Sequence, residues 1–312
     1  MLVLSKASTT CRRVTFSRFQ SFCSLAAVAL LILCAAEANA QFLYESDAGT
    51  GTINRFTSSG SKSVFATGFS SPRGIVFDSS GNAYISEYGA GDIVKIAPGG
   101  GRSIFVNDIT LPEGLACDSS GNIYVADYWT GNVIKITSGG SESIFASGFN
   151  SPKGIALNSS GDLFVASEGD NGIYEVTPGG SVSLFASESA PQHVAVDSHG
   201  NLYGTVQDPG SVVEISQGGA NTTIGTGFTY PWGIAIDPSS NIFASDLYGG
   251  TIKEYFAGGG STTFASGLSL PADLTYVPGP ATSSTPEPGT FAMLICLGVT
   301  GTAVLRKRRR SV

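Results

Sequence analysis

The chain has 312 residues, of which 42% are apolar and 13% charged, a composition typical of a folded domain and not of a disordered chain. Its 17 basic and 24 acidic residues give a formal charge of −7. The two ends are basic: residues 1–40 hold four bases and one acid, and residues 286–312 hold five bases and one acid. Residues 41–285 therefore keep 8 bases and 22 acids, a net charge of −14. This excess of negative charge repels polynucleotides and argues against a nucleic-acid-binding protein.

The first 40 residues have the pattern of an export signal. A basic segment ends at Arg18, an apolar run covers residues 25–36, and residues 38–40 (ANA) match a cleavage site made of small residues. We therefore predict a signal peptide over residues 1–40 and a mature chain that begins at Gln41.

The residues that follow contain an internal repeat. Prolines recur at steps of 39 or 40 residues, at Pro72, Pro112, Pro152, Pro191, Pro231 and Pro271. The first full unit predicts four short strands near residues 74–78, 83–87, 93–96 and 103–106, because β-branched and aromatic residues alternate there with turns rich in Gly, Ser and Asn. A period of this length, built from short strands, indicates propeller blades or a solenoid.

The ends of the repeat region decide between these two architectures. Residues 271–277 supply only a first strand, whereas residues 42–70 supply a second, third and fourth, so together they complete a sixth blade. A ring closed by strands from both ends leaves no incomplete blade with an open edge, and the caps that a solenoid needs are missing. We predict an all-β, six-bladed β-propeller over residues 41–277 that acts as a monomer. Its one cysteine, Cys117, occupies an apolar position of the repeat and is expected to be an inert buried thiol.

Three short patterns recur in the units: a P-x-G-I opening, a D-S-S-G-N turn, and a Y-V-A-D strand such as residues 124–127. On these residues the chain resembles the NHL repeat family over residues 42–277, and more loosely the streptogramin-lyase-like and gluconolactonase-like propellers. The resemblance implies the six-bladed fold and is weak for activity.

The C-terminal end has a different composition. Residues 278–285 form a linker of Pro, Ser and Thr, followed by Pro286, Glu287 and Pro288, an apolar run over residues 290–305, and a basic cluster over residues 306–310. The run is slightly short for a full membrane-spanning helix, and the basic cluster is expected on the cytoplasmic side. A single-pass anchor is the general interpretation.

The order of these parts over residues 286–312 resembles the PEP-CTERM sorting signal. That resemblance implies export across the inner membrane, transient anchoring in the membrane through the C-terminal segment, and processing by an exosortase-type enzyme, often beside exopolysaccharide production. The protein would then reside in the cell envelope, at the surface or outside the cell.

The first strand of each propeller blade lines the central channel, so the residues just after the repeating proline should ring one channel mouth. They differ from blade to blade: Arg73, Glu113, Lys153, Gln192, Trp232 and Ala272. The next position is glycine in four blades but His193 and Asp273 in the other two. The loops between second and third strands should add aromatic side chains to the same face: Tyr88, Tyr128, Trp129 and Tyr248.

These irregular positions are the candidate ligand-binding residues, since the regular ones are explained by the scaffold. The aromatic side chains could stack on a saccharide or grip a peptide, or they could serve loop packing. The alternative for Arg73, Glu113 and Lys153 is that they form ion pairs between neighbouring blades. Such surface ion pairs contribute little to folding stability. The acids that recur at one place in four blades, Asp47, Glu87, Asp127 and Asp246, are expected to be structural.

Enzymatic alternatives depend on few residues. The gluconolactonase-like resemblance implies a divalent metal at the mouth, but only Glu113 and the displaced Asp273 fit, and Arg73 and Lys153 would repel a cation. We therefore expect no metal and no cofactor. The lyase-like resemblance implies histidines, and His193 is the one candidate acid–base group at the mouth.

Three functions follow from these residues. The leading hypothesis is a non-catalytic exported propeller that binds a glycan, a peptide or an envelope component at the mouth. The alternative is a lyase or lactonase that acts through His193. A structural protein of the extracellular matrix with no small ligand is the third.

Overall fold

The computed structural model describes residues 41–277, whose strands form six four-stranded antiparallel sheets. Blade I contains β4 (Pro72–Phe77), β5 (Ala83–Glu87), β6 (Asp92–Ile96) and β7 (Arg102–Val106). Blade II contains β8 (Pro112–Cys117), β9 (Ile123–Asp127), β10 (Asn132–Ile136) and β11 (Glu142–Ser147). Blade III contains β12 (Pro152–Leu157), β13 (Leu163–Ser167), the 3-10 turn η1 (Glu168–Asp170), β14 (Gly172–Val176) and β15 (Val182–Ser187).

The remaining blades follow the same plan. Blade IV contains β16 (Pro191–Val196), β17 (Leu202–Val206), β18 (Ser211–Ile215) and β19 (Asn221–Thr226). Blade V contains β20 (Pro231–Ile236), β21 (Ile242–Asp246), β22 (Thr251–Tyr255) and β23 (Ser261–Ser266). Blade VI contains β24 (Pro271–Val277), β1 (Phe42–Asp47), β2 (Thr52–Thr57) and β3 (Lys62–Thr67), in that spatial order.

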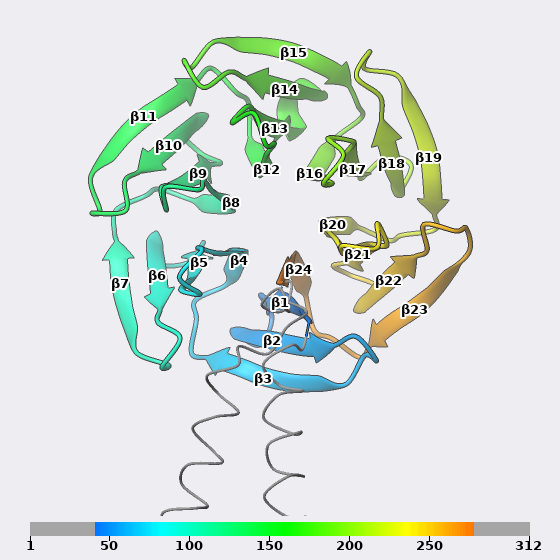
Figure 1. Cartoon of the computed structure of the whole chain (residues 1–312), viewed down its shortest axis with the longest axis horizontal. Coiled ribbons are helices and arrows are strands. Elements are labelled where there is room, and N and C mark those ends of the chain that lie inside the picture. Colours follow the sequence, from blue (N-terminus) through cyan, green and yellow to red (C-terminus); the bar gives the residue numbers. More distant parts are fainter. Residues whose placement is uncertain (1–40, 278–312) are drawn as a thin grey trace, which may run out of the picture. The chain divides into compact units, whose positions relative to one another are not determined.

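The six sheets surround a common axis, with β4, β8, β12, β16, β20 and β24 innermost (Figure 1). In blade VI, strand β24 pairs with β1, and Val277 lies opposite Phe42. The predicted six-bladed propeller is therefore confirmed for the part of the chain that the structure describes.

The inner strands begin two residues earlier than the sequence predicted, at the proline itself. In blade I, Pro72 pairs with Glu87 but Ile75 pairs with Ile85, so Arg73 and Gly74 together face a single residue of β5. Such a β-bulge re-aims side chains, and a register irregularity follows the proline in all six described blades. It falls at the positions where the candidate site residues lie.

The core lies between neighbouring blades. One cluster, for example, joins Tyr44 and Ile53 of blade VI to Ile75, Ile85 and Val94 of blade I. Because each sheet is covered on both faces, its three inner strands read as nearly continuous buried residues, while the outermost strands are largely exposed. Burial of this apolar surface is the main force that holds blade to blade.

A hydroxyl relay also links the blades. Ser86 Oγ accepts a hydrogen bond from Gly74 N at 2.7 Å and donates one to the carbonyl oxygen of Glu113 in the next blade at 2.6 Å. The equivalent residues in three other blades do the same: Ser46, Thr205 and Ser245. Blades II and III have Ala126 and Ala166 instead.

The recurring acids are structural, as predicted. Glu87 accepts a hydrogen bond from Ser70 N at 2.7 Å, and Asp246 accepts bonds from Thr229 N and Tyr230 N at 2.9 Å each. Each carboxylate thus ties the connector that enters a blade to the loop after its second strand.

The predicted signal peptide (residues 1–40), linker (278–285) and sorting signal (286–312) lie outside the described residues. Within residues 41–277, the structure contains no helix of the length and apolar character needed to cross a membrane.

Candidate functional site

The channel mouth is filled by a cluster of cationic and aromatic side chains. The Arg73 guanidinium carbon lies 4.7 Å from the centre of the Trp232 ring, and Lys153 Nζ lies 4.4 Å from it. Arg73 reaches Trp232 past β24, where the intervening residue is the small Ala272. Two cations therefore share one aromatic ring, an arrangement that the quadrupole of the indole favours.

Lys153 is held by polar partners as well as by this ring. Its Nζ lies 2.9 Å from Glu168 Oε1 and donates a hydrogen bond to Gln192 Oε1 at 2.5 Å. It also lies 3.5 Å from the Tyr230 hydroxyl. Burial lowers the pKa of Lys153 from its ordinary value, and the Glu168 carboxylate opposes that shift.

Glu113 has no such partner. It is 4% exposed, and among residues 41–277 its carboxyl group makes no hydrogen bond and no ion pair within 4.0 Å. The ion pairs considered for Arg73, Glu113 and Lys153 from the sequence are therefore not formed. Burial raises the pKa of Glu113 to about 7, although Arg73 and Lys153 act in the opposite direction.

His193 and Asp273 lie deeper, on the channel wall. His193 Nε2 is 3.1 Å from Asp273 Oδ1, and the other oxygen of Asp273 accepts a hydrogen bond from Ile75 N. Burial raises the pKa of Asp273, and His193 opposes the shift. The pair borders a cavity of about 200 Å³ that is otherwise lined mainly by apolar residues of the inner strands, including Leu115 and Ile155. His193 thus faces the channel interior and not the mouth surface.

The loop aromatics divide into two groups. Trp129 and Tyr248 are 72% and 65% exposed, whereas Tyr88 and Tyr128 are half-buried against the cations. The most exposed aromatic surface of this face is therefore supplied by the loops of blades II and V. By contrast, Trp232 is 6% exposed and belongs to the packed interior of the mouth.

Two residues of the mouth cluster were not predicted from the sequence. Tyr230 stacks on Trp232 with ring centres 5.6 Å apart and meets Tyr248 edge to face at 5.1 Å. Glu168 lies in the loop of blade III, where Ser167 takes the place of the recurring acid. Both stand one residue beside a repeat position, so a search for irregular residues in the flanking positions would have found them.

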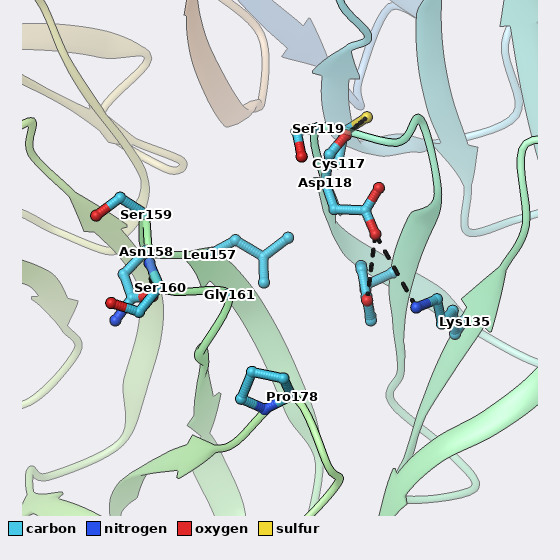
Figure 2. A pocket seen from close by; sticks show the side chains of 11 residues that line it. Cys117, Asp118, Ser119, Lys135, Leu157, Asn158, Ser159, Ser160, Gly161 and Pro178 are labelled. Atoms are coloured by element: carbon cyan, nitrogen blue, oxygen red, sulfur yellow. Dashed lines mark hydrogen bonds and ion pairs between the residues drawn. The ribbon is translucent and has the colours of Figure 1, made fainter.

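Hollows larger than the channel cavity lie elsewhere, between blades. Figure 2 shows one of about 480 Å³, lined by Asp118 and Lys135 of blade II and by residues 157–161 of blade III. Asp118 and Lys135 form an ion pair at 4.0 Å there. Cys117 borders this groove half-buried, and burial raises its thiol pKa to about 11, consistent with an unreactive thiol. A similar groove of about 400 Å³ lies between blades IV and V, so these hollows reflect the repeat.

No group of three or more His, Cys, Asp or Glu side chains in residues 41–277 is arranged to hold a metal ion. The cluster can instead offer a fixed positive charge, a buried carboxyl and flat aromatic surfaces.

Comparisons with known proteins agree with this architecture. Residues 284–310 match the PEP-CTERM protein-sorting motif, as the sequence analysis predicted. No curated protein matches the chain. Among solved structures, a chain of the nidogen/laminin complex has a TM-score of 0.69 at 18% identity, covering 76% of this chain and 98% of the other.

Virginiamycin B lyase from Staphylococcus aureus has the same fold. A catalytically inactive variant with quinupristin gives a TM-score of 0.58 at 15% identity, covering 77% of this chain and 96% of the other. The selenomethionine form gives 0.54 at 19%, covering 65% and 73%. At these identities the likeness shows the fold alone. The chain thus joins a six-bladed propeller to a PEP-CTERM motif, and the motif indicates export and sorting to the cell envelope or surface.

Proposed function

We propose that this exported propeller is a non-catalytic binding module whose channel-mouth face binds a glycan, a peptide or an envelope component. The observation that supports the proposal most strongly is the exposure of Trp129 and Tyr248 around a packed cation–aromatic cluster. Exposed aromatic side chains offer a large apolar contact area, and when they gather with polar groups on one face they are typical of recognition surfaces.

The rest of the chain fits this role. In the proposal, residues 1–40 are removed as a signal peptide, and residues 278–285 link the propeller to its sorting signal. The apolar segment anchors the protein in the membrane until an exosortase-type enzyme processes the motif that begins with Pro286, Glu287 and Pro288. The propeller acts as a monomer and needs no metal or cofactor.

The test is binding of the purified chain to glycan and peptide arrays, with the variant Trp129→Ala/Tyr248→Ala. We expect the double variant to fold normally, because both side chains are largely exposed, and to lose binding. Phe256→Ala is the matched control, since Phe256 is also exposed but lies in the turn after β22. Binding that survives the double variant, or binding lost equally in the control, would contradict the proposed face.

The second candidate function is a lyase or lactonase that uses His193. The ion-pair contact between His193 and Asp273 at the end of a channel cavity favours it, because a carboxylate beside an imidazole stabilises its protonated form, although His193 Nε2 makes no hydrogen bond within residues 41–277. Turnover of a panel of lactones and cyclic depsipeptides, abolished in His193→Gln, would support catalysis. Turnover that is unchanged in this variant would exclude the histidine.

A further inference from the structure

Arg73 differs from Lys153, the other cation of the mouth, because residues 41–277 offer it no acceptor. Among residues 41–277 no carboxylate lies within 4.0 Å of its guanidinium, and two of its nitrogens, Nε and Nη1, are buried without a hydrogen-bond partner. Buried donors are nearly always satisfied in folded proteins, so unsatisfied donors on a charged group indicate a place for an acceptor. Arg73 as a whole is half-buried, so part of its side chain remains exposed although Nε and Nη1 are covered.

The charge of Arg73 is also held in place. Its guanidinium carbon lies 4.7 Å from the ring centre of Trp232 and 5.2 Å from that of Tyr88. Aromatic faces stabilise a cation without neutralising it, so they keep the guanidinium ordered and charged. Lys153, by contrast, is neutralised by Glu168 at 2.9 Å.

Glu113 stands on the neighbouring inner strand, and no side chain or backbone group of residues 41–277 forms a hydrogen bond with its carboxyl group. The charged or titratable groups that act on it are Arg73 of β4, Lys153 of β12, Glu168 of η1, Asp273 of β24 and Tyr88 of the loop after β5. Its pKa of about 7 means that below neutral pH it carries a proton and can donate a hydrogen bond. An arriving anion would raise that pKa further, because a nearby negative charge disfavours the ionised carboxyl.

We propose, as a refinement that rests on the function proposed above, that the mouth binds a saccharide bearing a carboxylate, with the carboxylate on Arg73 and Glu113 donating a second hydrogen bond. Guanidinium groups match carboxylates in charge and geometry. A uronate ring combines this carboxylate with an apolar ring face, and in the proposal other rings of the saccharide stack on the exposed Trp129 and Tyr248. The net negative charge of the propeller opposes an anion only at long range, where salt screens it.

The experiment is calorimetric titration of the purified chain with three probes at equal ionic strength: an oligouronate, the same oligosaccharide with its carboxylates reduced to alcohols, and an oligoglutamate peptide. We expect the oligouronate to bind, and the reduced saccharide and the Arg73→Gln variant to show affinities lower by about tenfold or more, as the loss of a charge-assisted hydrogen bond predicts. Lys95→Gln is the matched control, because Lys95 also lies over two aromatic rings but near the opposite end of its sheet.

The pH dependence tests Glu113 separately. Oligouronate affinity should fall between about pH 5.5 and about pH 8, on either side of the pKa of about 7, and this fall should disappear in Glu113→Gln, which keeps a donor at every pH. Equal affinity for the reduced saccharide, or wild-type affinity in Arg73→Gln, would overturn the carboxylate site and leave the proposed saccharide-binding face standing. Tighter binding of the peptide would assign the ligand to another class, and failure of all three probes, with no array ligand either, would overturn both proposals.

Discussion

His193 and Asp273 meet at 3.1 Å although a whole inner strand, β20, lies between theirs in the ring. The contact exists because the equivalent residue of β20 is Gly233, which has no side chain to separate them. The same holds at the preceding position of each inner strand. Arg73 and Trp232 are in contact there because the residue between them, on β24, is the small Ala272. Small residues on the intervening strands therefore determine which large side chains of the channel come into contact.

Gly233→Ala is expected to destabilise the propeller strongly. A Cβ atom at this position would lie 2.7 Å from Asp273 Cα and against the carbonyl oxygen of Ala272, and neither backbone atom can move without opening the ring. Overpacking of this kind costs about 1–3 kcal/mol or more. Urea denaturation measures the loss. Gly99→Ala is the control, since no atom lies within 4 Å of its added Cβ, and a similar loss there would contradict the explanation.

The hydroxyl relay predicts opposite effects in two blades. Ser86→Ala leaves Gly74 N and the Glu113 carbonyl without their partner, and should lower the free energy of unfolding by about 1–3 kcal/mol. Ala126→Ser in blade II adds the missing hydroxyl and should raise it by about 0.5–1.5 kcal/mol. Both changes are read from denaturant midpoints. If the two substitutions shift the midpoint in the same direction, the relay does not stabilise the interface.

Glu113 should make stability depend on pH. Its folded pKa of about 7 lies above the ordinary value of 4.5, so the folded protein holds a proton that the unfolded chain has lost. The stabilisation is complete below about pH 4.5 and disappears as the pH rises through about 7, a change of up to about 3 kcal/mol. Glu113→Gln should flatten this part of the profile, which thermal melts across the pH range would show. A pH dependence of stability that is unchanged in Glu113→Gln would show that another group takes up this proton.

Glu45 is a second buried carboxyl, in blade VI, at the position that Ile85 occupies in blade I. Its Oε2 accepts a hydrogen bond from Asn54 at 2.7 Å, its Oε1 is buried with no hydrogen-bond partner among the described residues, and burial raises its pKa to about 8. The double variant Glu45→Ile/Asn54→Val copies blade I and should be at least as stable as the parent near neutral pH, because a polar pair is replaced by packed apolar groups.

The single variant Asn54→Val is the informative control for Glu45. It removes the only hydrogen-bond donor that the structure gives to this carboxyl within residues 41–277, and should be destabilised by about 1–3 kcal/mol. Chemical denaturation of both variants separates the two effects. A double variant that is less stable than Asn54→Val would show that the carboxyl itself supports blade VI.

The repeat made the fold and the number of blades predictable, because each proline-led unit repeats the same turns and strand residues. It also named several members of the mouth cluster, including Arg73, Lys153 and Trp232. It could not show that Trp232 and Lys153 are buried, since this follows from the bulge after the proline and from the loops that close over the mouth. The sequence repeat describes each blade separately, whereas the burial of these side chains depends on contacts with neighbouring blades.

Contacts between blades were likewise beyond the sequence. Glu168 and Tyr230 join the cluster from blades III and V, and which side chains meet depends on the size of the residue between them. The hydroxyl relay was missed for a related reason. In the sequence, Ser, Thr and Ala at one strand position look interchangeable. Only the structure shows that a hydroxyl at this position donates a hydrogen bond to a carbonyl oxygen of the next blade.

The pairing of β24 with β1 has a mechanical consequence. Val277 is the C-terminal residue of β24 and lies opposite Phe42, and β24 is hydrogen-bonded within its sheet to β1 alone. Tension applied through Val277 would therefore peel β24 away one residue pair at a time, the geometry in which a β-ladder offers least resistance. Peeling would proceed through Leu274 and then reach Asp273, whose carboxylate contacts Ile75 of blade I and His193 of blade IV. We expect that residue to bear the load when the protein is pulled from its C-terminal side.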